Sequence, residues 1–253
     1  MPNITLYDDG VHKNVLLEDF DANGIAVQSN QHLIIHAGEG MLLDPGGHKI
    51  YGKVLSETNS LLSGRELRYI FLSHQDPDIV AAMNGWLMTT GATAYISGLW
   101  TRFVSHFGFN HFIADRLKPI PDEGMIFEMG GARLLALPAH FLHSEGNFHL
   151  YDPTSKILYT GDLGASMGAE YRQVRDFDAH IPYIEGFHRR YMVSNRVMRA
   201  WADMVRTLDI EIIAPQHGAL FAGKEMVHRF IDWCADLECG SDLIIPIYKV
   251  PRA

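Results

Sequence analysis

Short apolar runs separated by turn residues fill the N-terminal part of the chain. Such alternating or continuous runs are typical of strands, and the Gly-, Asn- and Asp-containing segments between them are typical of turns. The pattern predicts a meander of antiparallel strands. The predicted strands cover residues 4–7, 14–19, 24–29, 32–37 and 41–44.

Helical and strand-like patterns alternate along the rest of the chain. Helices are predicted over residues 49–62, 78–88, 99–107, 194–207 and 223–237. Strands are predicted over residues 67–72, 94–96, 126–128, 132–138, 147–150, 157–160 and 211–214. The charged and aromatic segment 163–193 is expected to be irregular, and the tail 243–251 to form a last short strand. No internal repeat or linker divides this order, so we predict one α/β domain over residues 1–253, an αββα four-layer sandwich.

The composition narrows the classes of function. The 253 residues are 47% apolar, which is enough for a sizeable core. A net charge of −9 argues against nucleic acid or an anionic membrane surface as the main partner. The apolar runs are too short to span a membrane and the N-terminus has no signal-peptide pattern, so we expect a cytoplasmic protein without membrane insertion. Cys234 and Cys239 lie on different faces of a predicted helix, which argues against a disulfide between them.

Polar clusters follow several predicted strands, at the positions where layered α/β folds place their chemistry. In His74-x-Asp76-x-Asp78, three alternate side chains can converge on one point, and imidazole and carboxylate groups are metal ligands. His143, Asp162 and His217 lie in three later clusters, and 14 histidines in all is an unusually high number. Taken singly, each cluster has a plain alternative, a solvated turn or a buried histidine held by its neighbours.

The order and spacing of these clusters resemble the metallo-β-lactamase superfamily, and specifically its di-iron branch, over nearly the whole chain. Residues 73–78 resemble the signature metal loop of that superfamily, and Asp44-Pro45-Gly46 resembles its early turn. The eighteen residues between His143 and Asp162 match the spacing of flavodiiron proteins. His217 before Gly218 resembles the last ligand.

The resemblance implies a ligand set for two iron ions. It assigns His74, Asp76 and His143 to the first ion and Asp78 and His217 to the second, with Asp162 bridging them. Ligation by nitrogen and oxygen without a thiolate suits iron or manganese better than a structural zinc site. Zinc remains a possible substitute in prepared protein, because it binds such ligands more tightly than ferrous iron does.

The chain departs from the patterns of its relatives at two positions. Zinc hydrolases of the superfamily carry His-x-His-x-Asp-His and flavodiiron proteins carry His-x-Glu-x-Asp-His, whereas Asp76 and Ile79 stand at the second and last of these positions here. This variant is similar to the oxygen-binding di-iron proteins linked to bacterial chemotaxis, which lack a flavodoxin domain. No flavin is therefore expected, since the sequence ends at Ala253 without room for that domain.

Ile79 cannot coordinate, so the second iron is expected to be short of one ligand unless Glu145 or His140 supplies it. An open position beside two ferrous ions suits the binding of dioxygen. Nearby hydrogen-bond donors would then steady the bound molecule. The candidates for this role are His111, His140, Tyr171 and His188.

Three functions follow from this resemblance. The first is reversible or slowly turning-over dioxygen binding that informs a chemotaxis signalling protein. The second is reduction of dioxygen or NO with electrons from a separate flavoprotein or rubredoxin as redox partner. The third is metal-dependent hydrolysis, which the loss of two signature histidines disfavours. A homodimer is also implied, because flavodiiron relatives pair head to tail.

Overall fold

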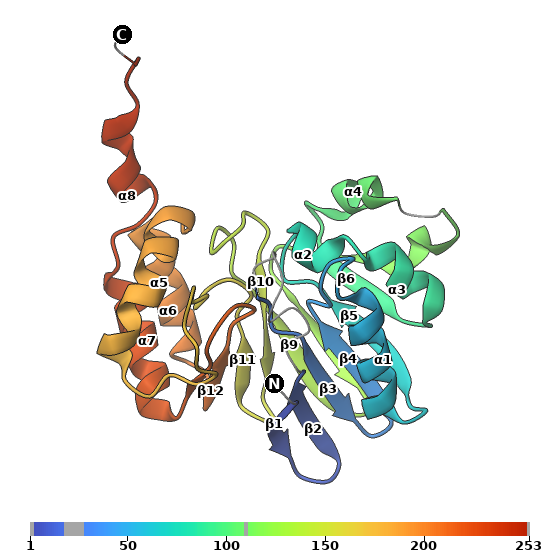
Figure 1. Ribbon diagram of the computed structural model, residues 1–253. Coiled ribbons are helices and arrows are strands. Elements are labelled where there is room, and N and C mark those ends of the chain that lie inside the picture. The colour runs from blue at the N-terminus through green and yellow to red at the C-terminus, as the bar shows by residue number, and fades with distance from the viewer. Residues whose placement is uncertain (1–2, 18–27, 109–110, 252–253) are drawn as a thin grey trace.

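The computed structural model describes residues 3–17, 28–108 and 111–251. Within them, two β-sheets pack face to face, with helices on both outer sides (Figure 1). In the first sheet the strands lie in chain order. The first four are antiparallel, and the remaining three are added in parallel. These strands are β1 (Ile4–Asp8), β2 (His12–Leu16), β3 (His32–His36), β4 (Glu39–Leu43), β5 (Glu66–Phe71), β6 (Thr93–Ser97) and β7 (Leu117–Ile120).

The second sheet has the order β13-β12-β11-β10-β9-β8. Its pairs are antiparallel except for β11 and β12, which run parallel. These strands are β8 (Met125–Met129), β9 (Ala132–Pro138), β10 (Phe148–Asp152), β11 (Ile157–Tyr159), β12 (Ile212–Ala214) and β13 (Phe221–Ala222). The first sheet thus comes from the N-terminal part of the chain, and the second from the part that follows.

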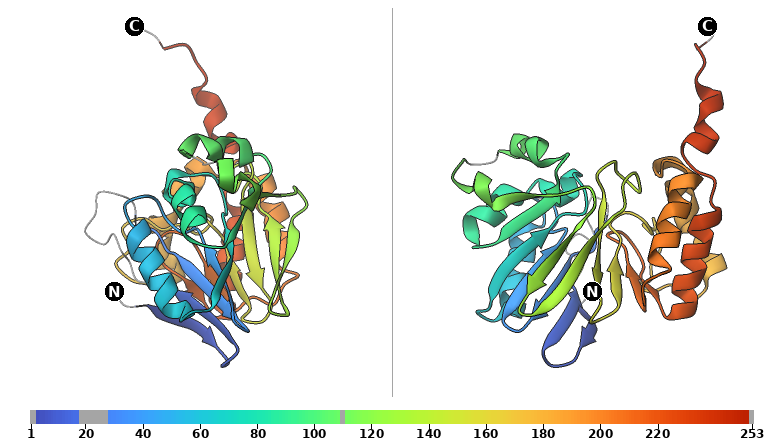
Figure 2. Two further views of the ribbon diagram at one scale, coloured as in Figure 1. Left: turned by 90° about the vertical axis from the view of Figure 1, so that its right-hand side faces the viewer. Right: turned by 180° about the vertical axis from the view of Figure 1, so that it is seen from behind.

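Helices α1, α2 and α3 cover the outer face of the first sheet, and α5, α6 and α7 cover that of the second (Figure 1). The C-terminal segment with α8 stands away from the body (Figure 2). The α-helices are α1 (Tyr51–Leu62), α2 (Pro77–Val80), α3 (Met83–Thr89), α4 (Thr101–Val104), α5 (Phe177–Tyr191), α6 (Asn195–Val205), α7 (Lys224–Asp236) and α8 (Ser241–Ile244). Short 3-10 helices cover Ser105–Phe107, His111–Arg116 and Ile245–Ile247. Among the residues described, no helix combines the length and the apolar character that a transmembrane span requires.

The alternation of side chains along the strands explains the layers. On the central strands of the first sheet, Ile34 and Phe71 face the other sheet, where they join Phe148 in one buried cluster. Their neighbours Leu33 and Ile70 face the helices and join a second cluster. Strands that are apolar on both faces in this way can only be stable between two covering layers. The arrangement confirms the predicted αββα sandwich.

Most predicted elements are present close to their expected bounds, but several segments differ. Strands β7 and β13 were not predicted, and the helix predicted over 78–88 is divided into α2 and α3. The segment 163–193 is not irregular throughout, because α5 occupies its second half. The buried face of α5 includes His180 and His188, and Pro182 lies inside the helix, so the apolar pattern of a helix is hidden. The tail forms α8 and a 3-10 turn in place of the expected strand, and Pro246 offers no N–H for a strand ladder. The strand predicted over 24–29 lies mostly outside the described residues.

Two buried histidines make the stability of the folded protein depend on pH. Burial lowers the pKa of His32 on β3 and of His149 on β10 to about 3 each. The Trp201 indole N–H donates to His149 Nδ1 at 3.1 Å, while Nε2 of each ring has no partner within the described part of the chain. Protonation would therefore place a buried charge without a partner, so both rings stay neutral in the folded protein.

Acidification is expected to destabilise the metal-free protein between pH 6.5 and about 5, above the ordinary range of carboxyl groups. In this interval the unfolded chain takes up protons on both histidines, and the folded protein does not, so low pH favours unfolding. His149→Gln keeps an acceptor for Trp201 but cannot titrate. Urea unfolding at several pH values should show a slope reduced by about 1.4 kcal/mol per pH unit in this variant. An unchanged slope would contradict the prediction.

Candidate metal centre

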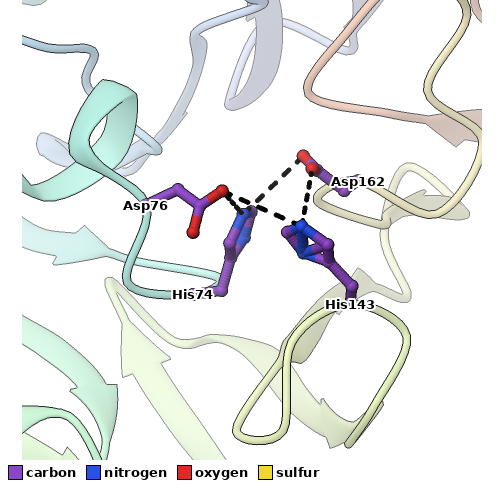
Figure 3. Close-up of side chains that lie close together, drawn as sticks. All are labelled: His74, Asp76, His143 and Asp162. Carbon is purple, nitrogen blue, oxygen red and sulfur yellow. Dashed lines mark ion pairs between the residues drawn. The ribbon is translucent and has the colours of Figure 1, made fainter. Parts of the chain in front are cut away.

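All six side chains of the predicted ligand set lie at one end of the sandwich. From the first sheet, His74 and Asp76 come from the loop after β5, and Asp78 from the first turn of α2. From the second sheet, His143 lies between β9 and β10, Asp162 after β11, and His217 after β12. Figure 3 shows four of these side chains, each carried by a loop, pointing toward a common centre.

The first group consists of His74, Asp76, His143 and Asp162, whose ligand atoms all lie within 4.8 Å of one another. The distance from Asp76 Oδ2 is 3.7 Å to His74 Nε2 and 3.8 Å to His143 Nε2. Asp162 lies 3.8 Å from each of the same two nitrogens. These distances are too long for hydrogen bonds, but two ligands that each lie about 2 Å from a shared ion are separated by roughly this much.

The second group shares Asp162 with the first. His217 Nε2 lies 3.3 Å from Asp78 Oδ2 and 3.4 Å from Asp162 Oδ1. The other oxygen of this carboxylate, Oδ2, faces His143. Oδ1 also lies 3.8 Å from His74 Nε2. Asp162 therefore adjoins histidines of both groups, as a carboxylate shared between two metal ions would.

Two of the three histidine rings are oriented by contacts on their second nitrogen, whereas His143 Nδ1 is buried and has no hydrogen-bond partner among the described residues. His74 Nδ1 lies 2.9 Å from Ser73 Oγ, and His217 Nδ1 lies 2.5 Å from the carbonyl oxygen of Gln28. An imidazole that donates from Nδ1 keeps the lone pair of Nε2 for a metal ion. The donor set and these outer contacts fit a pair of divalent cations.

Two glycines shape the turn that carries Asp162. Gly161 and Gly164 have φ values of +51° and +100°, a region that side chains rarely adopt. A Cβ at Gly164 would lie 2.8 Å from Pro215 Cγ, so the turn also packs closely. The Thr160 hydroxyl donates to the Leu163 carbonyl at 2.6 Å, which closes the turn from inside. The sequence Thr160–Gly164 thus fixes the direction of the Asp162 side chain.

Crowding of carboxylates dominates the electrostatics of the site. Burial alone would lower the pKa of His74, but Asp162 and Asp76 outweigh it and raise this pKa to about 9. At His217, burial again lowers the pKa, but Asp78 and Asp162 outweigh burial and raise the pKa to about 9. In the metal-free protein both rings therefore carry a second proton at neutral pH and are positively charged. These protons balance negative charge that a metal ion would otherwise balance.

Metal binding is therefore expected to release about two protons at pH 7, one each from His74 and His217. The apparent affinity should rise with pH below pH 9, about tenfold per pH unit for each displaced proton. Calorimetric titration in buffers of different ionisation enthalpy measures the number released. A binding enthalpy that does not depend on the buffer would contradict the expectation.

The other residues singled out in the sequence do not belong to the two groups of ligands. Ile79 is fully buried in the cluster between the first sheet and its helices. His140 Nε2 lies 2.9 Å from the Asp122 carbonyl, and the Tyr171 hydroxyl lies 2.7 Å from His180 Nδ1. Glu145 is exposed.

His188, on α5, is completely buried. Burial lowers its pKa to about 4, so the ring is neutral. Its Nδ1–H donates to the Ile184 carbonyl, and its Nε2 accepts from the Gly164 N–H at 2.8 Å. His188 therefore supports the turn behind Asp162. The side chain of His111 lies outside the described residues.

The sequence patterns did not indicate two glutamines that contact carboxylates of the ligand set. Gln75 Nε2 donates to Asp76 Oδ1 at 3.1 Å, and Gln216 Nε2 donates to Asp78 Oδ2 at 3.3 Å. Each glutamine stands next to a histidine of the set, His74 or His217. That adjacency is the available signal in the sequence, but it does not show which way an amide side chain turns.

Comparison with known proteins places this chain in a family. A family model described as "ODP family beta lactamase" matches residues 27–218. The peroxy diiron species of chemotaxis sensor ODP is 40% identical, with a TM-score of 0.85 over 98% of this chain and 100% of that one. The apo state of the sensor from T. denticola is equally similar, over 97% and 99%.

More distant relatives share the fold. A flavo di-iron protein mutant from Thermotoga maritima is 18% identical, with a TM-score of 0.73 over 93% of this chain and 62% of that one. An uncharacterized protein of Methanocaldococcus jannaschii is 20% identical over 90% of this chain, which spans 59% of that protein's length. The family match and the full-length similarity agree with each other. The chain belongs to the ODP family, a branch of the metallo-β-lactamase fold.

Proposed function

We propose that this protein is a non-haem di-iron protein that binds dioxygen and acts as an oxygen sensor or carrier. The observation that carries the proposal is the shared position of Asp162 between two groups of ligands, one of which is short of a member at Ile79. The 40% identical relative, a chemotaxis sensor described as a peroxy diiron species, supports the same function. We further propose a chemotaxis signalling protein as the partner and the cytoplasm as the place of action.

In this proposal the chain forms one di-iron domain. His74, Asp76 and His143 hold the first ion, Asp78 and His217 hold the second, and Asp162 joins the two sites. Two ferrous ions, when bound, supply the electrons and the coordination position that dioxygen requires. The protein's part is to hold the carboxylates and imidazoles in place, with three negative charges against the four positive charges of the metals.

The proposal is tested by exposing anaerobic, ferrous-loaded protein to dioxygen. New visible absorption should develop with a stoichiometry of one dioxygen for two iron ions. Zinc-loaded protein is the control, because zinc has no redox chemistry and should give no such band. Absence of new absorption in fully iron-loaded protein would refute the proposal.

A second candidate function is the reduction of dioxygen or NO with electrons from a separate flavoprotein or rubredoxin. One feature favours it. Tyr191 is 54% exposed, and the centroid of its ring lies 5.2 Å from that of the His143 ring. A cavity of about 300 Å³ beside these two residues extends to Ile244 and opens to the surface, where an electron donor would have access. Steady consumption of dioxygen or NO with NADH and added redox partners supports this function, and inactivity with each partner counts against it.

A further inference from the structure

The second group of ligands lacks a fourth protein side chain. Asp78, Asp162 and His217 come together, and Ile79 is buried among apolar residues of the first helical layer. Gln216, the residue before His217, lies at the same place and is only 2% exposed. Its role depends on how its backbone and its amide are held.

The backbone of Gln216 is fixed on both sides. Its N–H donates to the Gly161 carbonyl at 2.7 Å, beside Asp162, and its carbonyl accepts from the Asn30 N–H at 2.5 Å. The Asn30 amide also donates to the carbonyls of Pro215 and Gly218 at 2.9 and 3.0 Å. These bonds tie the loop that carries Gln216 to the turn that carries Asp162.

The side chain of Gln216 ends at the second group of ligands. Its Nε2 lies 3.3 Å from Asp78 Oδ2, the atom that His217 Nε2 also approaches to 3.3 Å. Its Oε1 is buried, and no hydrogen-bond partner for it is found in the part of the chain that the structure describes. A buried amide oxygen without a partner is unusual and points to a missing cation or water.

The two ends of an amide suit opposite charges. Without a cation, the N–H end must face the Asp78 carboxylate, since the oxygen end would repel it. With a divalent cation beside Asp78, the oxygen end becomes the favourable one, and a rotation of the amide brings it there. A neutral carbonyl oxygen also adds a ligand without adding charge to the three carboxylates.

We propose that the amide oxygen of Gln216 is a ligand of the second metal ion and takes the place in the ligand set that Ile79 leaves open. This inference rests on the proposed two-metal function and deepens it. It implies that dioxygen meets a second ion with four protein ligands, one of them a weakly held amide.

Gln75 provides a matched comparison within the same molecule. It too adjoins a histidine of the set and donates to a carboxylate, Asp76, at 3.1 Å. Its Oε1, however, already accepts a hydrogen bond from the Ser144 hydroxyl. If glutamine acts at these positions only by donating to a carboxylate, the two residues are equivalent. If Gln216 is a ligand, they are not.

The test is a titration with Co²⁺ in the absence of dioxygen, with the affinity and the visible absorption of the second ion as readouts. Gln216→Leu should lower the affinity for the second ion by about 10–100-fold, the range known for supporting groups of metal sites. Gln216→Glu should bind it at least as well as the unchanged protein, because a carboxylate oxygen replaces the amide oxygen. Gln75→Leu should leave the second-ion affinity close to that of the unchanged protein.

The Glu variant decides the question, because a carboxylate can be a ligand but cannot donate to Asp78. The proposal is overturned if Gln216→Glu lowers the affinity for the second ion as much as Gln216→Leu does, or if Gln216→Leu leaves that affinity unchanged. Thermal unfolding of the metal-free variants checks that each is folded. The ¹³C chemical shift of the side-chain carbonyl of Gln216 in zinc-loaded protein gives an independent readout. Since no dioxygen takes part, failure of the oxygen-binding function would not affect these results.

Discussion

Asp162→Asn is expected to leave the protein unable to hold two metal ions and to abolish the absorption that develops with dioxygen. Asparagine keeps the size of the side chain but loses its charge and one of its two ligand oxygens. In the structure Oδ2 faces His143, and Oδ1 faces both His74 and His217. Loss of an outer supporting group costs about 10–100-fold in metal affinity, so loss of the shared ligand should cost more than about 100-fold for the second ion.

Metal analysis after dialysis against ferrous iron, followed by titration, measures the effect of Asp162→Asn. Asp176→Asn is a suitable control, since Asp176 is an exposed acid that caps α5 through the Ala179 N–H and takes no part in the ligand set. The control should retain two ions per chain. Retention of two ions by Asp162→Asn as well would show that the carboxylate is not shared between the sites.

Asp152→Ala is expected to cause the largest loss of stability, about 3–5 kcal/mol, through a buried polar cluster that contains none of the candidate metal ligands. The Asp152 carboxylate is fully buried and accepts from His12 Nε2 at 2.7 Å, Asn14 Nδ2 at 2.8 Å and the Ser155 hydroxyl at 2.6 Å. Burial alone would raise the pKa of Asp152, but the hydrogen bonds from these three residues lower it. Removal of the carboxylate leaves their donors buried without an acceptor.

This cluster also joins the two sheets, because His12 and Asn14 lie on β2 and Asp152 ends β10. Urea unfolding of the metal-free protein at pH 7 measures the loss. Asp209→Ala removes an exposed acid paired with Lys156 and Lys224 and should change stability only slightly. The expectation fails if both variants unfold at the same urea concentration.

The ligand set was open to prediction because metal ligands interrupt a regular pattern. His74, Asp162 and His217 are polar residues that directly follow apolar strands, and the order of such positions along a chain is visible in one dimension. The resemblance to the superfamily's signature motif, not the polar pattern, located Ile79 as a departure. It did not show where the side chain of Ile79 points, which depends on the packing of α2 against the first sheet.

Features that depend on distant contacts were not predictable in this way. Helix α5 was missed because His180 and His188 occupy its buried face, and they are tolerated there through bonds to Tyr171 and Gly164. Strand β7 carries Lys118 and Pro119 and owes its conformation to pairing with β6. Gln216 was missed because its contact with Asp78 spans 138 positions of the chain.

The division of the proposed ligand set between the two sheets has a consequence for the lifetime of the protein. His74, Asp76 and Asp78 belong to the first sheet's side, and His143, Asp162 and His217 to the second's. Any ion held by both sides ties the two sheets together. Free metal at 100 times its dissociation constant adds about 2.7 kcal/mol per site to the free energy of unfolding. In an iron-starved cell the sheets would separate more often and expose cleavage sites, so the abundance of this protein is expected to follow the iron supply.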